Sequence, residues 1–146
     1  MNGFRFTLEK ALELRRLQLQ LEETKFQRQT AALVELDRIR EGMLASRAHA
    51  EAQVREGGST LGIDLAALGA FRRHIQVKEK ALAQRRAEEE KKLEQCRAAM
   101  MEARRRCKLL ERLKERRKAE WEAAFSRELD QVAAESFLAQ WNRGQA

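Results

Sequence analysis

The residues best suited to chemistry are few, and their spacing does not gather them into a site. The chain has two histidines, His49 and His74, and two cysteines, Cys96 and Cys107. The two cysteines would lie roughly 16 Å apart along one helix, which is too far for a disulfide. No glycine-rich phosphate loop, nucleophile motif or metal-ligand spacing is present. The sequence therefore predicts a non-enzyme with no cofactor, no metal and no small-molecule substrate.

Clustered positive charge is the strongest chemical feature of the sequence. Residues 97–118 contain ten basic and three acidic side chains, whereas residues 119–146 contain two basic and five acidic ones. Three explanations are open: phosphate binding to nucleic acid, a solvated helix face with i,i+4 ion pairs, or docking on an acidic protein surface or anionic lipid. No aromatic residue within 97–118 offers a base a stacking surface, so nucleic acid is the least favoured of the three.

An apolar repeat within residues 93–110 indicates that these basic residues lie on a helix. Charged residues make up 36% of the chain, aromatic residues 5%, and there is no proline. Such a composition is typical of long helices and coiled coils. The apolar positions recur at alternating spacings of three and four, which predicts a narrow stripe on a helix that requires a partner helix. They are Leu93, Cys96, Met100, Ala103, Cys107 and Leu110.

The partner helix is expected within the same chain. Leu12, Leu19, Phe26 and Leu33 recur every seven residues, and the run Gly57-Gly58-Ser59-Thr60 is the only strong helix-breaking cluster. We predict a single all-α domain over residues 1–146, an antiparallel coiled-coil hairpin of two long helices. The first helix is expected at about 7–56, the turn at about 57–63, and a longer second helix at about 64–142.

A turn centred near residue 59 fixes which residues face each other across the hairpin. It places Met43 opposite Ile75, Phe26 opposite Leu93, Leu19 opposite Met100 and Leu12 opposite Cys107, so that apolar residues meet. Leu33 opposite Arg86 is the exception and predicts a weak layer.

Two sets of apolar residues fall outside this repeat. Leu14, Leu17 and Leu21 form a second stripe near the start of the first helix, suited to either extra core packing or partner contact. The second helix is expected to extend several turns beyond the first. Its large aromatic residues would then lie out of reach of the first helix, namely Trp121, Phe125, Phe137 and Trp141.

Particular motifs at the two ends of the chain resemble the flagellar export protein FliJ family. The opening motif is Phe4-Arg5-Phe6-x-Leu8-Glu9-x-x-Leu12-x-Leu14-Arg15-Arg16. The later motifs are Leu110-Glu111-Arg112-Leu113-Lys114-Glu115-Arg116-Arg117 and Glu128-Leu129-Asp130-Gln131-Val132-Ala133. Chain length and the expected helix–turn–helix layout also agree, so the resemblance covers essentially the whole chain.

The resemblance implies a function that periodicity alone does not. It implies a soluble, non-catalytic stalk of the flagellar type III export apparatus that engages the export ATPase ring and the cytoplasmic domain of the export gate and assists export chaperones. On this sequence the residues expected at the ATPase end are Leu14, Leu17, Leu21, Arg104, Arg105, Lys108, Arg112, Arg116, Trp121 and Phe125. The nearest candidates for gate contact are Phe71 and Ile75, although core packing explains Ile75 equally well.

The expected location is the cytoplasm, in peripheral association with the export apparatus at the inner membrane. The sequence contains no run of eighteen apolar residues, so no membrane span is expected. Its N-terminal residues lack the apolar block of a signal peptide. Three alternatives stay open: the stalk of a virulence-type secretion system, a basic nucleic-acid-binding coiled coil, and a structural coiled coil that dimerises through residues 121–141.

Overall fold

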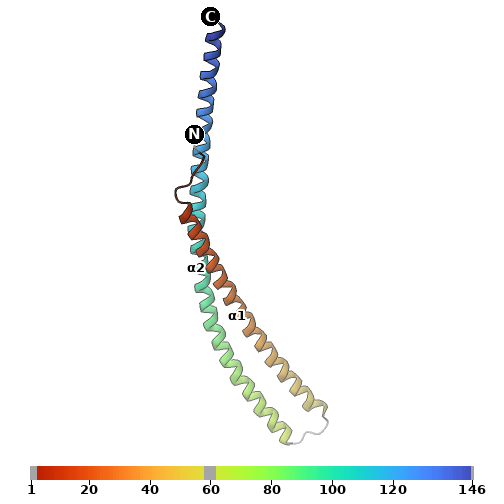
Figure 1. Cartoon of the computed structure of the whole chain (residues 1–146). Coiled ribbons are helices and arrows are strands. Elements are labelled where there is room, and N and C mark those ends of the chain that lie inside the picture. The colour runs from red at the N-terminus through yellow and green to blue at the C-terminus, as the bar shows by residue number, and fades with distance from the viewer. Residues whose placement is uncertain (1–2, 58–61, 146) are drawn as a thin grey trace. The chain divides into compact units, whose positions relative to one another are not determined.

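Two long helices make up almost all of the computed structural model, which describes residues 3–57 and 62–145. Helix α1 covers Glu9–Glu56 with 48 residues and helix α2 covers Gly62–Gly144 with 83 residues (Figure 1). The all-α fold with a longer second helix is confirmed. Helix α1 begins two residues later than expected, and most of the expected turn, residues 58–61, lies outside the described residues. The chain divides into two compact units, unit 1 with residues 1–20 and 102–146 and unit 2 with residues 21–101.

Unit 2 is an antiparallel pair formed by the later part of α1 and the earlier part of α2 (Figure 1). Its buried apolar side chains are Leu33, Leu36 and Ile75. From residue 68 to residue 100, buried or half-buried positions on α2 recur every three or four residues, as in a coiled-coil seam. The ion pair between Arg40 and Glu79, 3.6 Å between Nη2 and Oε1, agrees with the predicted register.

Unit 1 has its own small core, made by the first turns of α1, the residues before them and a central stretch of α2. Phe6, Leu12 and Cys107 are buried there, and Leu12 has no exposed surface. Phe4, Leu19, Leu110 and Leu113 pack around these three side chains. Leu12 and Cys107 thus share one core, as the register predicts. Burial is the main cause that raises the pKa of the Cys107 thiol, so this cysteine stays protonated and packs as a small apolar residue.

Residues 3–8 form a short segment that we call the N-terminal strap, and this segment lies along α2 (Figure 1). The ring centroid of Phe4 lies 6.1 Å from that of Trp121, and Trp121 stacks on Phe125 at 5.2 Å. Trp121 is therefore in contact with residues that precede α1, a contact that the helical repeat does not predict. Phe137 and Trp141 lie farther along α2 and are exposed, as expected.

Replacing Phe4 by alanine is expected to loosen the strap. The loss of the ring contact with Trp121 should cost about 1 kcal/mol of unfolding free energy and should shift tryptophan emission to longer wavelength. Urea unfolding followed by tryptophan fluorescence measures both effects. Leu138→Ala is the control, because Leu138 is 58% exposed and does not belong to the core of unit 1. Equal losses in both variants would contradict a stabilising strap.

Candidate partner-binding surfaces

The second leucine stripe on α1 faces solvent. Leu14, Leu17 and Leu21 expose 54%, 59% and 62% of their surface. The explanation that they add core packing is therefore wrong. Helical geometry gives the reason, because two residues advance a helix by roughly 200° and so carry Leu14 to the side opposite the buried Leu12. Leu14 and Leu17 belong to unit 1 and Leu21 begins unit 2.

Basic side chains follow the exposed side of α2 in unit 1. Arg105, Lys108, Arg112 and Arg116 are all exposed, at spacings that keep them on one side of the helix. Arg105 pairs with Glu102 at 3.1 Å and Arg116 with Glu120 at 3.9 Å, each pair lying within the helix. Lys108 and Arg112 make no ion pair within the described residues, so their charge is available to a partner.

The other residues expected at the ATPase end are less accessible. Arg104 is half-buried and takes part in contacts of its own. Trp121 is half-buried and contacts the strap through Phe4, and Phe125 is half-buried and stacks on Trp121. An accessible surface in unit 1 is therefore built mainly from the two leucines of α1 and the four exposed basic residues of α2.

The two residues proposed for gate contact differ in accessibility. Ile75 is buried in the core of unit 2, which agrees with its reading as a packing residue. Phe71 is half-buried and lines an open groove of about 410 Å³ near the turn, together with Val54 and Leu68. Phe71 is the one of the pair that a partner can reach.

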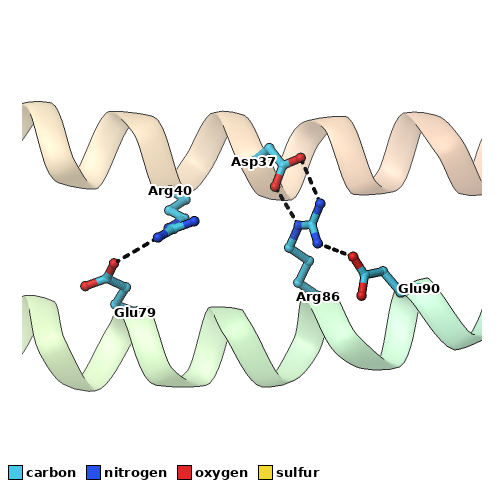
Figure 2. Close-up of polar contacts among 5 residues, drawn as sticks. All are labelled: Asp37, Arg40, Glu79, Arg86 and Glu90. Atoms are coloured by element: carbon cyan, nitrogen blue, oxygen red, sulfur yellow. Dashed lines mark hydrogen bonds and ion pairs between the residues drawn. The ribbon is translucent and has the colours of Figure 1, made fainter.

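A set of polar side chains interrupts the apolar seam of unit 2. We call Asp37, Arg40, Glu79, Arg86 and Glu90 the polar layer, and Figure 2 shows them bridging α1 and α2. Arg86 Nε donates to Asp37 Oδ1 at 2.7 Å, and the same guanidinium also contacts Glu90. This hydrogen bond is the main cause that lowers the pKa of Asp37.

The polar layer corrects the expectation of a weak layer at Leu33. Leu33 is buried, and Arg86 reaches Asp37, one turn farther along α1, instead of opposing the leucine. Nearby, Gln29 Nε2 donates to the backbone oxygen of Glu89 at 3.0 Å and also to its carboxylate. An open groove of about 550 Å³ lies beside the layer, lined by Leu36, Leu82 and every side chain of the layer except Glu90.

Acid should weaken unit 2 through this layer. Hydrogen bonds from Arg86 and from Gln29 hold the pKa values of Asp37 and Glu89 below their ordinary 3.8 and 4.5. A carboxyl whose pKa is lowered by folding stabilises the fold above its unfolded pKa, and this contribution is lost as pH falls through the folded value. Arg86→Gln should therefore destabilise the protein at about pH 7 and have a smaller effect at about pH 2.

The measurement is the urea midpoint at the two pH values, followed by circular dichroism. Arg73→Gln is the control, because Arg73 is exposed and makes no ion pair within the described part of unit 2. The same loss for Arg86→Gln at both pH values would contradict a role for the carboxylates.

No metal site or membrane-spanning helix appears among residues 3–57 and 62–145. No three side chains of the metal-binding types His, Cys, Asp and Glu come together there to hold an ion. No described helix combines the length and apolar character needed to cross a membrane. Comparison of the chain with protein-family models, with curated proteins and with solved structures gave no match.

Proposed function

We propose that the chain is a non-catalytic component of the bacterial flagellar type III protein export apparatus. It acts as a coiled-coil stalk that engages the export ATPase ring and the cytoplasmic domain of the export gate and assists the handling of export chaperones and their substrates. In this role it works in the cytoplasm, at the membrane-bound export apparatus.

One observation carries the proposal: two of the three motifs that resemble the FliJ family, the opening motif and the motif at residues 110–117, meet in the core of unit 1. Phe4, Phe6 and Leu12 of the opening motif pack with Leu110 and Leu113 of the later motif. Residues far apart in the sequence thus form one structural element. This supports reading the two motifs as parts of a single functional end of the hairpin.

The surface around this core has the properties of a protein-binding end. Exposed leucines offer apolar area that a partner can bury, and apolar contacts generally dominate the centre of an interface. Lys108 and Arg112 provide charge that favours an acidic partner surface and speeds association. Phe71 in unit 2 supplies a separate apolar contact for the gate.

A binding assay with the export ATPase tests the proposal. The purified chain is mixed with the flagellar export ATPase and with the virulence-type ATPase of the same organism, where one exists, and binding and ATP hydrolysis are measured. We expect binding to the flagellar enzyme and faster hydrolysis. Preference for the virulence-type enzyme would move the assignment to that secretion system, and binding to neither would refute the stalk function.

Nucleic-acid binding is the second candidate, favoured by the row of exposed basic residues on α2. Four phosphate contacts from Arg105, Lys108, Arg112 and Arg116 to a single strand predict an affinity that falls with salt with a log–log slope of about −3. Fluorescence anisotropy with labelled single-stranded RNA at several salt concentrations measures this slope. A steep slope without any effect on the ATPase would favour this candidate over the stalk.

A further inference from the structure

A second seam follows the outer face of α2 in unit 1. Its residues recur mostly at alternating spacings of three and four, and all of them are exposed. We call them the outer seam: Arg105, Leu109, Arg112, Arg116, Ala119, Ala123, Arg127, Asp130, Ala134, Phe137 and Trp141. Such spacing places them on one side of a helix and is typical of a surface that pairs with another helix.

Nothing in the described chain covers this face. Leu109 follows the buried Cys107 by two residues, a rotation of roughly 200°, so the seam lies opposite the core of unit 1. The strap contacts α2 at Trp121, whose half-buried ring lies off the outer seam. The outer seam is thus an apolar and charged face that packs against no other helix of the described chain.

The two halves of the outer seam differ in chemistry. The first half is basic, with Arg105, Arg112 and Arg116. The second half has no net charge, with Arg127 and Asp130, and ends in the aromatic residues Phe137 and Trp141. When a second copy runs in the opposite direction, the basic half of each helix lies against the uncharged, aromatic half of the other.

We propose that two copies of the chain pair antiparallel through their outer seams, about a two-fold axis at Ala123. This register places Arg116 opposite Asp130 and Leu109 opposite Phe137, and each contact occurs twice because the interface is isologous. The small side chain of Ala123 meets its own copy and lets the two backbones approach. The paired stretch from Arg105 to Trp141 is roughly 54 Å long.

The chemistry of each position favours this arrangement over a parallel one. Opposite Arg105 lies Trp141, whose ring face attracts a guanidinium. A parallel pair would instead set each arginine of the first half against its own copy, and like charges opposite one another are destabilising. The concentration of arginine in the first half therefore selects the antiparallel direction.

The proposed dimer does not depend on the proposed function, but it would limit how the chain binds the ATPase. The pair covers Arg105, Arg112 and Arg116, which we assign to the ATPase-binding surface. A second copy and the ATPase would then compete for the same face of α2. Failure of ATPase binding and failure of self-association are separate observations and test separate proposals.

Disulfide trapping tests the register at the two-fold axis. Ala123→Cys places two thiols across the axis, whereas Ala124→Cys points the thiol away from it by roughly 100° and serves as the matched control. Under mild oxidation we expect the first full-length variant to form at least about tenfold more covalent dimer than the second. The unmodified chain gives the background from Cys96 and Cys107. Equal trapping at both positions would overturn the register.

Charge exchange tests the complementarity of the two halves. Sedimentation equilibrium of the full chain is expected to show a monomer–dimer equilibrium that salt weakens. Arg116→Asp alone and Asp130→Arg alone should each weaken the dimer about tenfold or more, and the double variant should restore it. Lys91→Asp makes the same charge change on α2 outside the seam and should have little effect. A chain that stays monomeric up to about 100 μM, or a double variant no better than the single ones, would overturn the proposal.

Discussion

Replacing Leu12 by alanine is expected to lower the free energy of unfolding by about 3 kcal/mol. Leu12 is the only described side chain with no exposed surface, and it packs against Phe6 and Cys107 in the core of unit 1. Truncation leaves a cavity that a core of so few side chains cannot close by rearrangement. Urea unfolding, followed by circular dichroism and by tryptophan fluorescence, measures the loss.

Leu14→Ala is the control for this experiment. It removes the same atoms from the same helix, two residues along, at a side chain that is 54% exposed. We expect a change within about 0.5 kcal/mol, since surface substitutions away from special features usually have small effects. Equal destabilisation by the two variants would show that the core of unit 1 does not form as described.

The double variant Leu14→Asp/Leu17→Asp is expected to weaken binding to the export ATPase about a hundredfold. Both leucines are exposed, and on the proposed function their apolar area is buried by the ATPase. Each carboxylate placed in an apolar interface must lose its hydration without gaining a partner, which is costly. The dissociation constant, measured by biolayer interferometry, gives the result.

A matched control separates a binding effect from a folding effect. Val34→Asp introduces a carboxylate at a side chain of α1 that is 62% exposed and lies in unit 2. It should leave ATPase binding unchanged, and all three proteins should show the same thermal melt by circular dichroism. Unchanged binding in the double variant would exclude the two leucines from the ATPase interface.

The architecture could be predicted from the sequence because apolar spacing reports burial directly. The repeat through Leu12 and Leu19 and the seam from Leu93 to Leu110 predict two partner helices, and the glycine pair at residues 57–58 separates them. The expected bounds differ from those of α1 and α2 by two residues at three of the four helix ends. Helix length, order and unequal size follow from this pattern alone.

The surfaces were harder to predict, for two physical reasons. Apolar spacing does not predict that Arg86 and Asp37 lie between the two helices, because the pattern marks only apolar residues. These two charged side chains contribute to the seam by pairing with each other. Apolar spacing also detects no tertiary contact for the strap, because Phe4 and Phe6 precede the helix and follow no helical period. The exposure of Leu14 was undecided for a related reason, since a leucine on a helix fits a core and an interface equally well.

The contacts between α1 and α2 also favour a particular order of folding. In unit 2 the pair Glu51–Arg72 closes a separation of 21 residues, and Asp37–Arg86 closes 49. In unit 1 the pair Glu9–Lys114 closes 105. Short loops close at lower entropic cost and at higher rate, so association begins beside the turn and proceeds away from it. During synthesis the strap is made before both helices but has no docking site until Trp121 has left the ribosome, so it is among the last segments to form its tertiary contacts.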